Sequence, residues 1–76
     1  MSWNFRVIED KRDQNPKYHY CFIAEVYYDK KNNLMGYTHK WGVNMLAEDL
    51  KSLKSYHKIS GEAFNYPVLN ILDFEQ

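Results

Sequence analysis

The sequence has few of the residues on which secreted mini-domains and nucleotide-binding enzymes depend. It contains one cysteine, Cys21, and only three glycines and two prolines. A single cysteine cannot form a disulfide within the chain, which argues against a disulfide-stabilised secreted domain. The glycines stand singly, so no glycine-rich phosphate loop is present. No apolar run approaches the roughly 18 residues of a membrane span, and charged residues interrupt the N-terminal segment, so we expect no signal peptide, no membrane association and a cytoplasmic protein.

The sequence also lacks an excess of charge of either sign. Ten Lys and Arg residues offset ten Asp and Glu residues, and the formal net charge is +0. This balance argues against a general nucleic-acid binder and against a polybasic membrane-surface protein. The charges are distributed unevenly. Residues 30–58 carry most of the lysines, and the charged residues among 59–76 are all acidic. The middle of the chain is therefore the part suited to an acidic partner.

Hydrophobic and aromatic residues are abundant by contrast. They make up 45% and 17% of the chain, which indicates a folded domain rather than a disordered segment. A chain of 76 residues buries only about 60% of the surface that it exposes when unfolded. We therefore expect one small domain, residues 1–76, with a thin core.

Three segments in the first half have the period-two pattern of β-strands. Residues 3–8 alternate aromatic and branched side chains with polar ones, and the charged residues 9–17 that come next predict a loop. Residues 18–29 carry apolar side chains on both faces, which predicts a central strand. Asp and Asn residues between positions 29 and 33 predict a tight turn. Residues 34–40 then form a third strand, with Gly36 at a bulge or a close backbone approach.

The second half predicts one helix and one strand. The helix is expected to begin near Asn44, as its N-cap, and to end near residues 60–61, with Glu48 and Asp49 in its early turns. Leucines recur along one side of this helix at helical spacing. Residues 66–74 alternate as a last strand, in which Pro67 belongs at the start or on an edge because proline cannot donate a ladder hydrogen bond.

The predicted order is strand, strand, strand, helix, strand. We therefore predict an α+β fold, with an antiparallel sheet of three or four strands and one helix packed on one face. The other face is either open, or covered by the C-terminal segment or by a second copy of the chain.

Short motifs in order along the chain resemble those of a family of small uncharacterised bacterial proteins. In this sequence they are residues 3–8 (WNFRVI), 25–29 (EVYYD), 36–38 (GYT), 46–50 (LAEDL) and 67–69 (PVL). The family has no established activity, so the resemblance implies a fold and no site. The order of elements is also similar, more loosely, to that of HicB-type antitoxins, and a fold-level likeness does not assign a function.

Residue types that carry catalysis or metal binding are present only in isolation. His19, Cys21 and His39 are candidate zinc ligands, but a structural zinc site needs four ligands and the usual spacings are missing. Cys21 in mid-strand is more typical of a small apolar residue than of a nucleophile. Glu48 and Asp49 are adjacent on the predicted helix and therefore point apart. We expect no enzyme, no metal site and no cofactor.

Aromatic rings with nearby lysines form the most distinctive feature of the sequence. Such a set is suited to packing in a thin core, to a protein interface or to stacking of single-stranded nucleic acid. We favour these uses in that order, because the zero net charge argues against nucleic acid. The predicted partner-binding residues are Tyr27, Tyr28, Tyr37, Trp41, Lys30, Lys31 and Lys40.

Three further lysines, Lys51, Lys54 and Lys58, recur at helical spacing in the predicted helix. Such a basic stripe is most often a solvated helix face, and the sharper interpretation is a contact for an acidic surface or a phosphate backbone.

These observations favour a non-catalytic interaction protein with an unknown protein partner, and a homodimer is consistent with them. Two other hypotheses stay open. The first is a small regulator or inhibitor of one host protein, of the antitoxin or phage anti-defence kind. The second is a weak binder of single-stranded nucleic acid.

Overall fold

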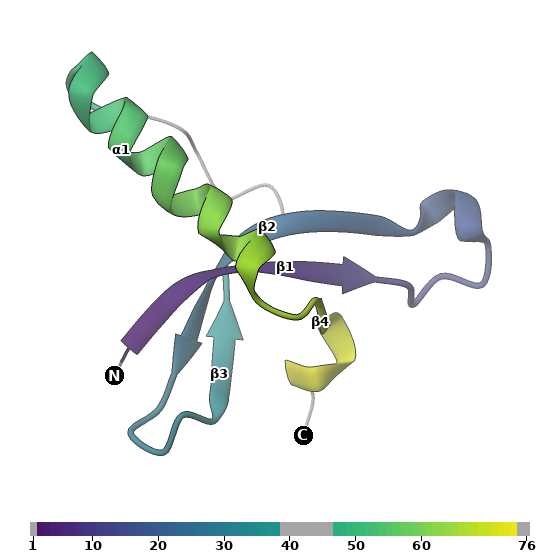
Figure 1. Ribbon diagram of the computed structural model, residues 1–76. Coiled ribbons are helices and arrows are strands. Elements are labelled where there is room, and N and C mark those ends of the chain that lie inside the picture. The colour runs from purple at the N-terminus through teal and green to yellow at the C-terminus, as the bar shows by residue number, and fades with distance from the viewer. Residues whose placement is uncertain (1, 39–46, 75–76) are drawn as a thin grey trace.

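Four strands and one α-helix make up the fold. The computed structural model describes residues 2–38 and 47–74, and every structural statement concerns those residues. In them the elements occur in the order strand, strand, strand, helix, strand, with three short 3-10 helices (Figure 1). The α+β class and the predicted order are confirmed.

The two longest strands form the centre of the sheet. Strand β1 (Ser2–Asp10) pairs antiparallel with β2 (Tyr20–Tyr28) along their whole lengths. β1 continues two residues beyond the predicted strand, because Glu9 and Asp10 still pair with β2 although they are charged. β2 pairs on its other edge with β3 (Leu34–Tyr37), so its predicted position inside the sheet is confirmed.

The turn between β2 and β3 forms where the sequence predicts it. Asp29 Oδ1 accepts hydrogen bonds from the backbone N–H groups of Lys31 and Asn33, at 2.8 and 2.9 Å. Asn32 has a φ of 62°, in the left-handed region that asparagine tolerates better than most residues. Local side-chain chemistry therefore reverses the chain.

Strand β3 is shorter than predicted and contains the predicted irregularity. Leu34 and Gly36 lie opposite Tyr28 and Tyr27, which are consecutive, so Met35 is an extra residue on β3. The predicted bulge therefore lies beside Gly36. The alternative, a close backbone approach, is not seen, because no atom beyond Gly36 and its two chain neighbours lies within 4 Å of the position that a Cβ would take. β3 ends at Tyr37, and residues 39–40 of the predicted strand lie outside the described residues.

The helix α1 (Leu50–Gly61) begins later than the sequence predicts. Asp49 is its N-cap, with extended backbone and a side chain that accepts a 2.7 Å hydrogen bond from the Ser52 N–H. Residues 47–49 are not helical, so a helix that runs from Asn44 is wrong, and Asn44 itself lies outside the described residues. The Asp49 carboxylate, which the sequence places in an early helical turn, is therefore the group that caps the first turn of the helix.

The predicted long last strand is also wrong. Only β4 (Leu69–Asn70) pairs in the sheet, and the 3-10 helix η3 (Ile71–Phe74) comes directly after it. The Asn70 N–H donates to Asp73 Oδ2, and Asn70 Oδ1 accepts from the Leu72 N–H, both at 2.9 Å. These side-chain bonds to the backbone compete with strand pairing and bend the chain into a helical turn.

The sheet is mixed, which corrects the antiparallel prediction. Its order is β3-β2-β1-β4, and β4 runs parallel to β1. β3 runs in the same direction as β1, and α1 then returns the chain so that β4 runs in that direction as well. A parallel pair needs a crossover of this kind, and α1 provides it.

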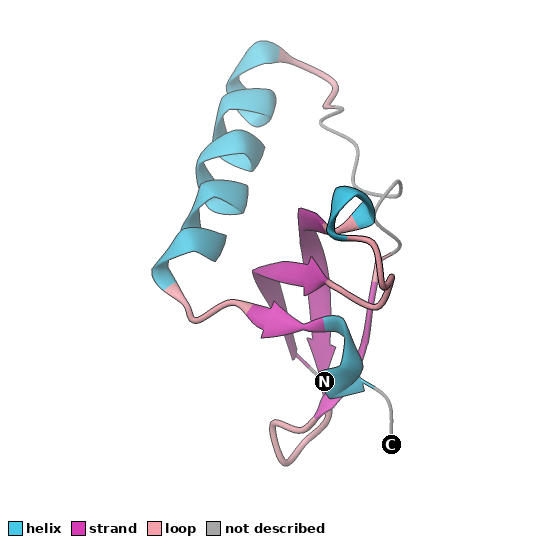
Figure 2. Cartoon of the chain, turned by 90° about the vertical axis from the view of Figure 1, so that its right-hand side faces the viewer, coloured by secondary structure: helices cyan, strands magenta, loops and turns pink. Residues whose placement is uncertain are grey.

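The sheet has a different cover on each face. The C-terminal face, which η3 covers, holds the buried cluster Ile8, Ala24, Val26 and Ile71. The opposite face, here the helical face, holds a smaller cluster of Phe5, Val7 and Ala63, with Tyr56 of α1 packed against it. Figure 2 shows α1 on one side of the strands. Of the three predicted alternatives for the second face, cover by the C-terminal segment is the one observed.

The helix α1 packs on the sheet with its C-terminal half only. The ring of Tyr56 meets that of Phe5 at 5.5 Å between centroids, and Ser60 is buried. The first turn extends past the strands in Figure 1, and Leu50 is 66% exposed. Half of the amphipathic face of this helix therefore lacks the cover of the sheet.

Candidate functional site

The tyrosines of the predicted partner-binding set do not share one surface. Tyr28 and Tyr37 lie on the C-terminal face, where both are half-buried against its core cluster. The Tyr37 ring packs against Phe74, with 4.7 Å between centroids. Tyr27 is adjacent to Tyr28 on β2 and therefore points to the helical face. The packing of Tyr28 and Tyr37 fits the core alternative that the sequence left open.

Tyr28 also belongs to a polar network. Its hydroxyl donates to Asn4 Oδ1 at 2.8 Å and accepts from the Arg6 guanidinium at 3.0 Å. The same guanidinium donates to the Pro67 carbonyl at 2.7 Å, so it links the sheet to the segment that leads into β4. This tyrosine therefore joins two parts of the fold.

The lysines of the set are exposed where they are described. Lys30 and Lys31 lie on the β2–β3 turn, which Asp29 holds. The backbone N–H of Asn33, and then that of Lys31, keep the pKa of the Asp29 carboxyl below its usual value. Trp41 and Lys40 lie outside the described residues. Binding by this set stays a prediction.

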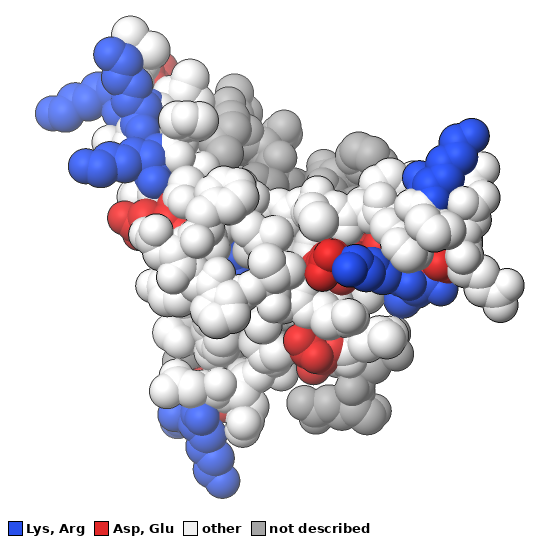
Figure 3. Space-filling model, turned by 45° about the vertical axis from the view of Figure 1, so that its right-hand side comes forward, with Lys and Arg blue, Asp and Glu red and all other residues white. Residues whose placement is uncertain are grey.

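The basic stripe lies on the helix as predicted. Lys51, Lys54 and Lys58 are exposed on α1, and Figure 3 shows blue side chains gathered at its projecting end. A hollow of about 340 Å³ beside them is lined by Leu50, Leu53, Lys54 and His57. Apolar and basic groups therefore alternate along the uncovered part of α1.

Two of the three candidate metal ligands, His19 and Cys21, lie in the described residues. His19 Nε2 lies 2.7 Å from the Asp13 carbonyl oxygen, and Cys21 is exposed on β2. Within residues 2–38 and 47–74, no group of three or more His, Cys, Asp or Glu side chains is placed to hold a metal ion. His39 lies outside the described residues.

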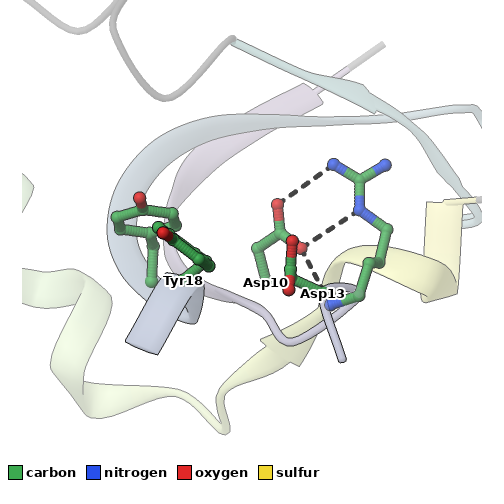
Figure 4. Close-up of a pocket in the computed structure, with 5 residues that line it drawn as sticks. Asp10, Asp13 and Tyr18 are labelled. Carbon is green, nitrogen blue, oxygen red and sulfur yellow. Dashed lines mark hydrogen bonds and ion pairs between the residues drawn. The ribbon is translucent and has the colours of Figure 1, made fainter. Parts of the chain in front are cut away.

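A polar hollow of about 560 Å³ lies at the far end of the β1–β2 hairpin. It is lined by Asp10, Arg12, Asp13, Tyr18 and Tyr20. Figure 4 shows the Asp10 carboxylate turned to a guanidinium, which is that of Arg12: Nε donates at 3.1 Å and Nη2 at 3.0 Å. The backbone N–H of Arg12 also donates to Asp10, at 3.2 Å. This carboxylate thus holds the loop in shape and is engaged by a cation.

A third hollow, here the β1-edge hollow, lies where β1 meets the end of α1. Its volume is about 410 Å³, and apolar side chains from both elements form most of its walls. No β2 residue lines it, and the side chains from β1 come from both faces of the sheet, so it runs along the edge of β1 away from β2. The lining residues are Trp3, Asn4, Phe5, Ile59, Glu62 and Tyr66.

Three apolar walls of this hollow are half exposed. Trp3 is 51% exposed, Ile59 48% and Tyr66 46%. Together such side chains present an apolar area of roughly 300 Å², the size at which patches on soluble proteins are often functional. We call Trp3, Ile59 and Tyr66 the edge patch.

The walls of the hollow are held in place from behind. The Trp3 indole packs edge-on against Phe5, with 5.3 Å between centroids and an interplanar angle of 86°. Phe5 is buried and packs in turn on Tyr56. On the other side, the Arg6 guanidinium lies 5.2 Å from the centre of the Tyr66 ring. The patch is therefore fixed in shape before any partner binds.

Inspection of the sequence does not find the edge patch. Trp3 lies in a segment whose pattern predicts a β-strand, and Ile59 and Tyr66 lie more than fifty residues later in the chain. The only available signal is that Ile59 lies on the helix away from the leucines. The patch depends on the crossover that brings the end of α1 to the edge of β1.

No family model, curated protein or solved structure matches the chain. The resemblance to small bacterial proteins and to HicB-type antitoxins therefore stays a prediction.

One finding bears on membranes. No α-helix among residues 2–38 and 47–74 has both the length and the apolar character needed to cross a bilayer.

Proposed function

We propose that this chain is a non-catalytic protein-interaction domain of the cytoplasm, which binds its partner through the edge patch of Trp3, Ile59 and Tyr66. Such a domain acts by covering or bridging a surface of the partner. An adaptor and an inhibitor of one protein both work in this way. The single cysteine, Cys21, is in keeping with a reducing compartment.

The observation that carries this proposal is the exposed apolar surface at the edge of β1. Trp3, Ile59 and Tyr66 are each about half exposed, and they line one hollow of about 410 Å³. Aromatic and aliphatic side chains gathered around a hollow are typical of the centre of a protein interface.

The character of the surface supports binding rather than catalysis. Ten large apolar side chains are exposed among the described residues, while seven apolar residues form the buried core there. The polar hollow at the end of the β1–β2 hairpin is lined by the Asp10–Arg12 ion pair, which holds the loop. Apolar area in a fixed shape favours association, because little side-chain freedom is lost on binding.

The proposal is tested by affinity capture from a native extract with variants of the edge patch. Trp3→Ser removes the largest exposed side chain of the patch. Met35→Ser is the matched control, because Met35 is 57% exposed but lies on β3, at the other edge of the sheet. We expect a stoichiometric protein that binds the wild-type chain and Met35→Ser and is lost with Trp3→Ser.

Two outcomes would contradict the proposal. A partner that both variants retain places the interface elsewhere, for example on the predicted residues Tyr27, Lys30 and Lys31. Capture that disappears after nuclease treatment and weakens steeply with salt indicates nucleic acid, and the lysines of α1 are then the candidate contacts.

A further inference from the structure

We infer that the partner of the edge patch is a second copy of this chain, bound about a two-fold axis so that Trp3 of each copy enters the β1-edge hollow of the other. The inference rests on the proposed function and names the partner for the same surface. Its arguments are the shape of the patch, the free edge of β1 and the charge of the chain.

The patch contains both a projecting group and a receiving hollow. Trp3 is half exposed on the rim, and the hollow of about 410 Å³ beside it has apolar walls from Phe5, Ile59 and Tyr66. In a two-fold interface the same surface meets itself, so a surface that carries a knob and a hole side by side is complementary to its own copy. Two symmetric Trp3 insertions then form from one patch.

The edge of β1 at this hollow lacks a neighbouring strand. β4 pairs with β1 only at Ile8 and Glu9, so residues 2–7 form a sheet edge within the part of the chain that the structure describes. The Thr38 N–H donates to the Glu25 carbonyl, so the backbone groups of Glu25 point to β3 and away from β1. Phe5 lies opposite Glu25 in the β1–β2 pair, so the backbone N–H and C=O of Phe5 point away from β2, to the free edge. The backbone groups of Trp3, two residues earlier on β1, point the same way.

This arrangement offers more than side chains to a second copy. Phe5 is buried, and its backbone is covered with it, whereas Trp3 is half exposed. A second copy in antiparallel orientation therefore meets unpaired backbone groups at Trp3 together with the apolar hollow. Natural proteins rarely leave such an edge beside apolar surface without a cover.

The charge of the chain is in keeping with self-association. The net charge is zero, so two copies do not repel each other through an overall charge. Glu62 is the only ionisable side chain among the lining residues apart from the Tyr66 phenol, and it is exposed.

The test is sedimentation equilibrium of the purified chain over a wide range of concentration. We expect a reversible rise from 9.2 kDa to twice that mass. Trp3→Ser and Ile59→Glu each raise the dimer dissociation constant at least about 30-fold, the loss typical of a central contact. Both residues are half exposed, so circular dichroism is expected to show the wild-type fold, and Met35→Ser leaves the dimer intact.

A spectroscopic measurement checks which side chain is covered. Trp3 and Trp41 are the two tryptophans, so a Trp41→Phe chain reports on Trp3 alone. Its emission shifts to shorter wavelength as the protein is concentrated, and adding Ile59→Glu removes the shift. A dimer that forms without the shift overturns the Trp3 insertion.

The outcomes separate this inference from the proposed function. A chain that stays at 9.2 kDa at every concentration overturns the dimer, while capture of another protein that depends on Trp3 still supports the interaction domain. A dimer that survives Trp3→Ser and Ile59→Glu but is lost with Met35→Ser overturns the location and moves the interface to β3.

Discussion

The two faces of the sheet differ in how completely their apolar side chains are covered. The C-terminal face buries Ile8, Ala24, Val26 and Ile71, and several half-buried aromatic rings pack around them. Among the described residues, the buried cluster of the helical face has three apolar members, Phe5, Val7 and Ala63, and Trp3 and Ile59 are half exposed at its edge. One face therefore resembles the interior of a small protein, while the other resembles half of an interface.

This difference between the faces indicates which part of a small protein with a thin core stabilises the fold and which part is available for binding. Free energy of folding comes mainly from apolar area removed from water, and the C-terminal face holds the larger of the two buried clusters. The helical face stays incomplete because α1 covers the strands only with its C-terminal half. Substitutions on the two faces can test this division.

The largest expected effect comes from the same substitution made once on each face. Ile8→Ala removes a fully buried side chain from the C-terminal face and should lower the free energy of unfolding by about 3 kcal/mol. Ile59→Ala, on the helical side, should cost well under about 1 kcal/mol at low protein concentration. Urea denaturation followed by circular dichroism measures both. Equal losses would show that the two sides contribute alike.

A smaller effect is expected for the polar network on the C-terminal face. Tyr28→Phe removes the hydroxyl that binds Asn4 and Arg6, and should lower the free energy of unfolding by about 1 kcal/mol. Tyr18→Phe, just before β2, is the control for loss of a tyrosine hydroxyl from an exposed ring. Urea denaturation measures the free energy of unfolding of both variants. Equal values would show that the hydrogen bonds of the Tyr28 hydroxyl do not stabilise the fold.

The projecting end of α1 is expected to respond to loss of its cap. Asp49→Ala removes the acceptor of the Ser52 N–H, so amide exchange in the first turn should become roughly five-fold faster. The sheet amides should not change, because this end of α1 does not pack on the strands. Faster exchange throughout β1 and β2 would contradict that separation.

The same cap gives a dependence on acid. The Ser52 N–H lowers the pKa of the Asp49 carboxyl from its ordinary value of 3.8, so the folded helix favours the charged form. The contribution of the cap is present above pH 3.8 and is lost as the pH falls through the lowered pKa. First-turn exchange, corrected for its intrinsic pH dependence, should rise there in the wild type and not in Asp49→Asn.

The smallest effect is expected at alkaline pH on the helical face. Burial raises the pKa of the Tyr56 phenol above 10.0, and the charges of Glu25 and Tyr27 add to the shift. The neutral phenol therefore stabilises the fold below pH 10.0, and this contribution is lost as the pH rises through the raised pKa. Stability should fall less steeply over that range in Tyr56→Phe. Identical alkaline profiles would contradict burial of this ring.

Local patterns predicted the first half of the fold well. Alternation identified the β1 and β2 segments, and the Asp and Asn residues after Tyr28 identified the turn, because strand faces and tight turns depend on neighbouring residues. The helix start failed because Asn44 and Asp49 are both good caps, and the choice between two caps depends on how the residues after each of them pack. The last strand failed because Asn70 and Asp73 bind the backbone locally.

The candidate site was less predictable than the fold. The lysines of α1 were found because helical spacing is visible in a sequence. The tyrosines were found as a group, but Tyr28 and Tyr37 proved to be packed, because alternation places residues on a face without showing which face is covered. The edge patch joins residues 3, 59 and 66, and no local pattern relates them.

By itself the sequence determined the α+β class, the order of the elements and the central position of β2, since these depend on short-range periodicity and composition. Only the tertiary structure decided that β4 runs parallel to β1, that the C-terminal segment covers one face, and that Trp3, Ile59 and Tyr66 meet. Those features depend on the direction in which α1 returns the chain and on how far it overlaps the strands. Both are properties of packing between distant segments, where many weak contacts act together and no single residue decides the result.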